Sequence, residues 1–274
     1  MGLGAHRHGS GAGGRLGPSA RARREPRCHA PLAPVLFLPV GTTFDVVAFD
    51  GDDTLWHNER LFAEAQAEFR SLLASFHPAE WIDARLEEAE RRNIPHFGYG
   101  IKGFSLSMIE TAIELTEGRI ESRDIRRILD VTKRMLAADV QLLDGVRETV
   151  AAVAASHRLL LITKGDLRDQ ERKVEQSGLG PFFEHVEIVS EKDARTYSAV
   201  LRRHGVPAER FLMVGNSLRS DVLPVLEVGG HAAHIPHALT WSHEVADPPP
   251  RGHPRFHSLP HIQGLPGLLR DLQV

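Results

Sequence analysis

The segment "FDVVAFDGDDTL" places three aspartates within four positions, directly after an apolar run. These are Asp50, Asp52 and Asp53, and carboxylates this close together repel one another. The end of a buried strand is a costly place for charge that has no partner. We therefore expect a bound cation beside Asp50 and Asp52, whereas Asp53 has the position of a residue that caps or solvates the turn.

Polar residues also follow three later apolar runs. Thr163 ends "RLLLIT", and Lys164 comes directly after it. Lys192 lies just beyond "HVEIV". Asn216 follows "RFLMVG", with Asp221 five residues further on. If these runs are parallel strands, their carboxyl ends share one edge of the sheet, where ligands bind. The polar residues are therefore expected to meet the aspartates there.

Together these side chains would supply carboxylates, a hydroxyl and an ammonium around one point. A divalent cation would relieve the repulsion among Asp50, Asp52 and Asp221. Mg²⁺ suits this role because it takes a few hard oxygen ligands and often bridges to a phosphate. Lys192 and the hydroxyl of Thr163 would hold the other phosphate oxygens. The pattern indicates phosphoryl transfer, in which positioning and charge stabilisation do most of the work.

The order of elements explains how these residues would be positioned. After residue 140, helical and β-rich segments alternate, which favours an α/β fold with a Rossmann-like parallel sheet covered by helices on both faces. Four amphipathic helices fill roughly 58–139 and separate the first strand from the others. We therefore divide the chain into an α/β core at 44–56 and 140–274 and an inserted all-helical cap at 57–139. The segment "LPGLLRDL" near the C-terminus is expected to form a short helix that docks on the core.

The chain resembles the haloacid dehalogenase (HAD)-like superfamily in the order and spacing of four motifs over about residues 44–235. The motifs are Asp50-x-Asp52-x-Thr54, then Thr163, then Lys192, then Gly215-Asn216-Ser217-x-x-x-Asp221. The helical block resembles the cap of the phosphoglycolate-phosphatase-like members. The resemblance implies a Mg²⁺-dependent phosphohydrolase that cleaves a small phosphomonoester.

The resemblance also implies a role for each motif residue. Asp50 would attack phosphorus to form an aspartyl-phosphate, and Asp52 would protonate the leaving oxygen and later activate water. The Asp50 carboxylate, the backbone carbonyl of Asp52 and the Asp221 carboxylate would hold Mg²⁺. Thr163 and Lys192 would bind the phosphoryl group.

The fourth motif departs from the common family pattern, which begins with an acid where this chain has Asn216. An amide oxygen can still bind the metal or a metal-bound water but adds no charge, so we expect weaker Mg²⁺ binding. Two other functions stay open. One is a metal-independent 2-haloacid dehalogenase, although such members of the superfamily lack the second aspartate that Asp52 supplies. The other is a catalytically silent protein that binds phosphate or Mg²⁺.

Four further residues are candidates for substrate binding. Asn58 and Arg219 lie close in sequence to the motifs, and Lys164 has a place at the entrance of the site. Lys102 belongs to the glycine- and aromatic-rich segment "HFGYGIKGFSL" between two cap helices. That segment either closes over the site or merely connects the helices.

Composition excludes some functions and leaves others open. The whole chain has a formal net charge of −3 and residues 1–43 carry +5, so the remainder carries −8. An acidic body disfavours nucleic acid as the partner. The resemblance implies a small phosphorylated metabolite instead. The only cysteine is Cys28, which excludes an intrachain disulfide and fits a cytoplasmic location. No stretch reaches the length of a membrane span. The oligomeric state is not indicated.

Two segments have simpler interpretations. We read the Gly-, Ala- and Arg-rich residues 1–43 as a disordered leader, with an export or transit signal or a misplaced start as alternatives. The sixteen histidines are scattered, and those at 231, 234, 237 and 243 have no acid or cysteine at ligand spacing, so we expect no zinc site.

Overall fold

The structure, a computed structural model, describes residues 43–273. The leader assigned to residues 1–43 therefore lies outside the described residues, apart from Thr43. Within residues 43–273, no helix is both long enough and apolar enough to cross a membrane.

One six-stranded sheet forms the centre of the core, in the order β3-β2-β1-β4-β5-β6. All five neighbouring pairs are parallel. The strands are β1 (Val46–Phe49), β2 (Arg158–Lys164), β3 (His185–Val189), β4 (Phe211–Gly215), β5 (His231–His234) and β6 (Phe256–Ser258). In the register of the sheet, Phe49 at the end of β1 lies beside Leu161 of β2 and Val214 of β4. The aspartates after β1 are therefore flanked by the ends of both neighbouring strands.

The side chains of β1 alternate between two packed layers, as expected for a strand buried on both faces. Val47 and Phe49 belong to a cluster with α5 and α9, whereas Val46 and Ala48 belong to a cluster with α7 and α8. The core helices are α5 (Val146–Ala154), α6 (Leu167–Ser177), α7 (Ala194–His204), α8 (Leu223–Glu227) and α9 (Leu265–Asp271). The parallel α/β sheet with helices on both faces confirms the expected Rossmann-like class.

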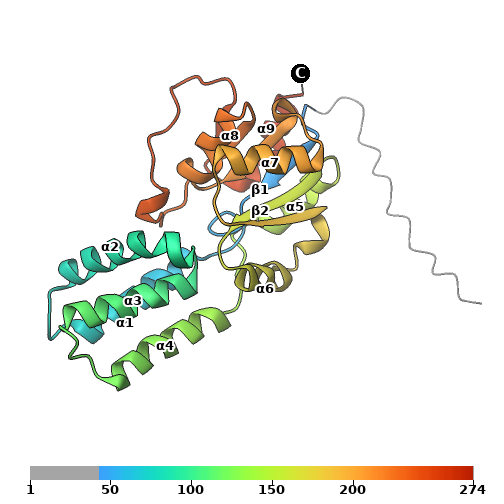
Figure 1. Cartoon of the computed structure of the whole chain (residues 1–274). Helices are drawn as coiled ribbons and strands as arrows, with labels where there is room; N and C mark the ends of the chain where they lie inside the picture. Colours follow the sequence, from blue (N-terminus) through green and yellow to red (C-terminus); the bar gives the residue numbers. More distant parts are fainter. Residues whose placement is uncertain (1–42, 274) are drawn as a thin grey trace, which may run out of the picture. The chain divides into compact units, whose positions relative to one another are not determined.

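Four consecutive helices separate β1 from the rest of the core and lie together as a bundle (Figure 1). They are α1 (Glu59–Leu73), α2 (Ala79–Phe97), α3 (Ile101–Leu115) and α4 (Ser122–Ala137). Their apolar faces form a separate core that includes Phe69, Leu86 and Met108. The inserted helical cap is therefore present as the spacing of apolar residues predicts.

The C-terminal segment differs from expectation in one respect. The expected short helix is α9, and its Leu265 and Leu269 are buried against the α5 side of the sheet. However, a sixth strand, β6, precedes it and pairs with β5. This strand has three residues in a proline-rich stretch, so it is too short to show an alternating pattern.

Candidate functional site

The carboxyl ends of β1, β2, β3 and β4 face a cavity of about 390 Å³. The other walls come from α1, α2 and α3 of the cap, from α6 of the core, and from residues 239–242 and 244 after β5. Asp50, Asp52, Thr163, Lys192, Asn216 and Asp221 all line this one cavity. The structure therefore brings together every motif residue that the sequence assigned to catalysis, phosphate binding or metal binding.

The centre of the site is a lysine between two buried carboxylates. Nζ of Lys192 lies 2.5 Å from Oδ1 of Asp50 and 2.7 Å from Oδ1 of Asp221. The exposed fractions of the three residues are 4%, 7% and 1%. Burial lowers the pKa of Lys192, but the carboxylates of Asp221 and Asp50 more than offset this and raise it well above its usual value. Lys192 therefore stays charged and holds the ends of three strands together.

One ammonium does not balance two carboxylates in so dry a place. Burial raises the pKa of Asp50 to about 7, because Lys192 only partly offsets the loss of water and Asp221 adds repulsion. When both aspartates are ionised, the ammonium of Lys192 therefore neutralises only one of their two negative charges. An additional cation would remove this excess.

The oxygen atoms around Asp50 suit a hard divalent cation. The hydroxyl of Thr54 donates to Oδ2 of Asp50 at 3.0 Å and lies 3.3 Å from Oδ1 of Asn216, so these three side chains meet at one place. Asp221 is fixed by the backbone N–H of Ser217, which donates to its Oδ2 at 3.0 Å. Within residues 43–273, no group of three or more His, Cys, Asp or Glu side chains is arranged to hold a metal. A cation here would rely on two carboxylates and neutral oxygens, a donor set that suits Mg²⁺.

Thr163 presents a buried hydroxyl that has no partner among residues 43–273. The residue is 1% exposed and lines the cavity. A Cβ atom placed on Gly51, in the loop after β1, would lie 3.3 Å from Oγ1 of Thr163. The hydroxyl is therefore close to that loop. A buried hydroxyl without a hydrogen bond is costly, and an anionic oxygen in the cavity would satisfy it.

Asp52 is held by three donors, none of which was predicted from the sequence. Nε1 of Trp56 donates to Oδ1 at 2.6 Å, and Nε2 of Gln170 donates to Oδ2 at 2.9 Å. Nζ of Lys173 lies 2.9 and 3.1 Å from the two carboxylate oxygens. Burial lowers the pKa of Lys173, but the charges of Asp52 and Asp169 outweigh this and raise it. The one signal in the sequence is that Gln170 and Lys173 are polar residues on the face of α6 that becomes buried.

Asp53 and Asn58 form the start of the cap. Asp53 accepts the backbone N–H groups of Asn58 and Glu59, as its reading as a capping residue predicts. Asn58 lines the cavity, but its Oδ1 accepts a hydrogen bond from Lys173 at 2.8 Å. Its side chain therefore supports the lysine that holds Asp52.

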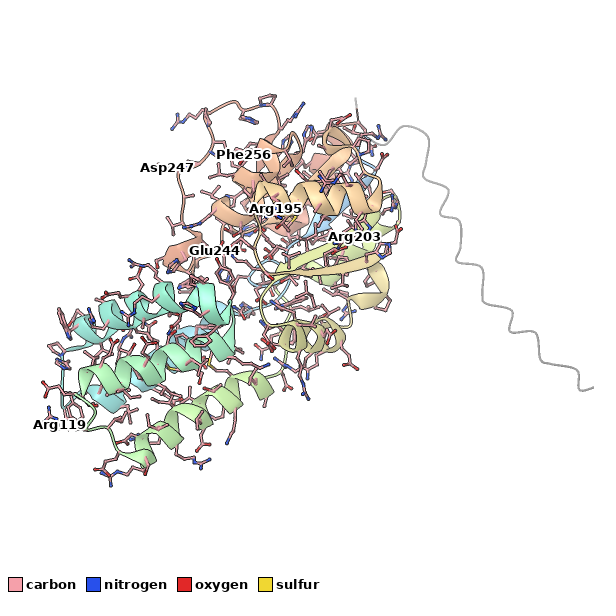
Figure 2. All side chains as sticks on the ribbon, in the orientation of Figure 1. Arg119, Arg195, Arg203, Glu244, Asp247 and Phe256 are labelled. Carbon is pink, nitrogen blue, oxygen red and sulfur yellow. The ribbon has the colours of Figure 1, made fainter. Side chains whose placement is uncertain are left out.

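Lys164 lines the cavity but is engaged by core and cap residues. Its Nζ lies 2.5 Å from Oε1 of Glu244 and 2.9 Å from the hydroxyl of Ser220. It also lies 4.1 Å from the centre of the Tyr99 ring. Glu244, which Figure 2 labels in the segment after β5, was not anticipated from the sequence because it lies far along the chain in a proline-rich region.

Two candidate substrate residues are not among those that line the cavity. Lys102 of α3 pairs with Asp166 at 2.9 Å, and its side chain is 53% exposed. The pair links the cap to the start of α6. Arg219 is exposed on the short π-helix Leu218–Val222. The structure thus brings Asn58 and Lys164 to the cavity wall and leaves Lys102 and Arg219 outside it.

Comparison with known proteins places this arrangement in a family. A family model described as haloacid dehalogenase-like hydrolase matches residues 44–229. A haloacid dehalogenase-like family hydrolase from Xanthomonas campestris is 47% identical, with a TM-score of 0.77, over 85% of this chain and 94% of that one. No curated protein matches the chain.

More distant solved structures share the fold. The putative HAD-hydrolase YfnB from Bacillus subtilis, solved bound to magnesium, is 18% identical with a TM-score of 0.56, over 82% of this chain and 98% of that one. A 2-haloacid dehalogenase from Pseudomonas syringae is 22% identical with a TM-score of 0.56, over 84% and 99%. Because the family model spans most of the described residues and the Xanthomonas protein matches nearly end to end, the chain belongs to the haloacid dehalogenase-like hydrolases.

Proposed function

We propose that this hydrolase is a Mg²⁺-dependent phosphatase that cleaves a small phosphomonoester through an aspartyl-phosphate. The observation that carries the proposal is the trio Asp50, Lys192 and Asp221 in one cavity with the hydroxyl of Thr163, which has no partner among residues 43–273. A buried carboxylate, a shared ammonium and a free hydroxyl donor match what an incoming phosphoryl group requires.

The two steps use two aspartates with different surroundings. Asp50 attacks phosphorus, and the bond to the ester oxygen breaks while Asp52 gives that oxygen a proton. Asp52 then takes a proton from water, which attacks the aspartyl-phosphate and releases phosphate and free Asp50. Lys173, Gln170 and Trp56 hold the Asp52 carboxylate in one position, as both proton transfers require.

Mg²⁺, held by Asp50, Asp221 and the neutral oxygens of Asn216 and the Asp52 backbone, would supply positive charge beside the phosphoryl oxygens. The excess negative charge of the two buried aspartates supports this assignment. Asn216 in place of an acid favours moderate rather than tight binding. Asp52 favours phosphate esters over haloacids, because the resemblance to the superfamily implies that its dehalogenases lack this second aspartate.

The test is a screen of phosphorylated metabolites and an aryl phosphate, each with Mg²⁺ and with a chelator, next to 2-chloropropionate. We expect phosphate release that requires Mg²⁺ and no chloride release. Chloride release in the presence of the chelator would establish the dehalogenase instead. Binding of phosphate or Mg²⁺ by calorimetry, without any turnover, would identify a silent binding protein.

A further inference from the structure

The described residues that line the cavity are unequally charged. They include eleven carboxylates and three lysines, and no arginine or histidine. The three lysines, at positions 164, 173 and 192, all come from the core. The part of the wall that comes from α1–α3 carries four carboxylates and no lysine, arginine or histidine. The cap therefore presents carboxyl groups and no cationic side chain to whatever part of the substrate extends away from Asp50.

Two of those cap carboxylates have no partner within residues 43–273. Asp83 pairs with Arg70, and Glu87 pairs with Arg91. By contrast, no hydrogen bond or ion pair reaches the side chain of Glu59 or Glu90 from the described part of the chain. Burial raises the pKa of Glu59 to about 8, with neighbouring carboxylates adding to the effect, and raises that of Glu90 to about 7.

The neighbouring surface is suited to an organic cation rather than to a metal. Phe62 and Phe104 line the same cavity, and their rings meet edge to face with their centres 5.1 Å apart. Aromatic rings and carboxylates together attract an alkylammonium group, whose stem packs on the rings while its N–H groups meet the oxygens. In addition, Oε1 of Gln170 is buried without a partner among the described residues, and the residue lines this cavity at 2% exposure. That oxygen can only accept a hydrogen bond, so the cavity lacks a donor that a ligand would bring.

We propose that the substrate is the phosphate ester of an amino alcohol, with its protonated amine bound by Glu59 and Glu90 of the cap. This inference rests on the proposed phosphatase function and names the class of ester that the cap selects. A second anionic group on the alcohol is disfavoured, because the cap wall offers it no cation.

The experiment compares three esters that differ in charge at one end. These are 2-aminoethyl phosphate, the isosteric but neutral n-propyl phosphate, and the anionic 2-phosphoglycolate, with p-nitrophenyl phosphate as a general substrate. We expect kcat/KM to fall in that order, with the amine preferred over the propyl ester by roughly tenfold to a hundredfold, as for one charge-assisted hydrogen bond.

The variants Glu59→Gln, Glu90→Gln and the double variant keep the shape of the wall and remove one or both of the carboxyl groups proposed to bind the amine. In the double variant the ratio of kcat/KM between the amine and propyl esters should fall to within about threefold of one. Glu80→Gln, on an exposed position of α2, is the matched control and should keep the preference of the unmodified protein.

The outcomes separate the two proposals. If p-nitrophenyl phosphate is hydrolysed but the unmodified protein prefers the propyl ester or phosphoglycolate, or shows no preference, the amino-alcohol assignment is wrong and the phosphatase stands. If no phosphate ester is hydrolysed at all, both fail. A preference for the amine that the double variant retains places the amine elsewhere and overturns the roles of Glu59 and Glu90. Because the comparison within the unmodified protein needs no variant, the test does not depend on a variant that folds.

Discussion

The two walls of the cavity differ in whether their carboxylates are paired with cations. On the core side, Asp50 and Asp221 share Lys192, and Asp52 is held by Lys173. On the cap side, Glu59 and Glu90 have no cation from residues 43–273. Buried ion pairs fix geometry at the cost of desolvation, whereas a half-buried carboxylate without a partner is stabilised when a ligand brings a cation to it. The core wall is therefore suited to chemistry at a fixed point, and the cap wall to distinguishing one substrate from another.

Removal of the nucleophile on the core wall should give the largest effect. We expect Asp50→Asn to lower the turnover of p-nitrophenyl phosphate with Mg²⁺ by at least roughly 10⁴-fold, since loss of a nucleophile removes the first covalent step. Asp45→Asn, at the start of the same strand, is the control and should keep its activity within about twofold. Normal hydrolysis by the Asp50 variant would refute both the mechanism and the comparison of the two walls.

Loss of the Lys192 ammonium, which Asp50 and Asp221 share, should have the next largest effect on activity. Lys192→Ala removes a charge contact to the phosphoryl group and leaves two buried carboxylates facing each other, so we expect kcat to fall by roughly two to three orders of magnitude. Steady-state kinetics would measure this, with Arg195→Ala on the exposed side of α7 as the control (Figure 2). Equal effects of the two substitutions would show that Lys192 has no special role.

The sequence was sufficient for the positions of the core wall. Asp50, Thr163, Lys192 and Asp221 each follow or end an apolar strand, and a parallel sheet brings such ends to one edge whatever the details of packing. Their meeting could therefore be inferred from order alone. The helical insertion was equally accessible, because four consecutive segments carry apolar residues at helical spacing.

The partners of these residues could not be inferred in the same way. Lys173 and Gln170 reach Asp52 across more than one hundred positions of sequence, and their contact depends on how α6 packs against the sheet. Lys102 looked suited to substrate but pairs with Asp166, since either use satisfies an exposed ammonium. Glu59 and Glu90 resemble the solvated face of an amphipathic helix until the cap is placed over the cavity. Tertiary packing alone decides these cases.

A substitution of Lys173 tests whether activity depends on the residues that position Asp52 on the core wall. Lys173→Met would remove the ammonium that Asp52 and Asp169 share, and would leave Asp169 with Arg172 alone. We therefore expect a loss of about 2 kcal/mol in the free energy of unfolding, as for hydrogen bonds to a charged group. A tenfold to hundredfold fall in kcat should accompany it, because Asp52 would lose one of the three donors that fix its position. Chemical denaturation and kinetics would measure the two effects. Arg168→Met, exposed on the same helix, should change neither. Unaltered kinetics in a destabilised Lys173 variant would limit this lysine to a structural role.

The smallest effect should come from the pH dependence of stability in the cap wall. The raised pKa values of Glu59 and Glu90 mean that the folded protein binds more protons than the unfolded chain between about pH 4.5 and 8. These two groups therefore make the folded state less stable as the pH rises through that window. Glutamine does not titrate, so the Tm of the Glu59→Gln/Glu90→Gln variant should rise relative to that of the unmodified protein as the pH increases.

If the difference in the free energy of unfolding between the two proteins changes by about 1 kcal/mol over this pH range, the difference in Tm should change by about 2–4 °C for a protein of this size. Scanning calorimetry from pH 5 to pH 9 would measure the difference, with Glu80→Gln as a control that should show no trend. If the Tm of the double variant instead falls relative to that of the unmodified protein as the pH rises, cations stabilise these carboxylates in the folded protein. The cap wall would then be paired like the core wall, and the contrast between them would disappear.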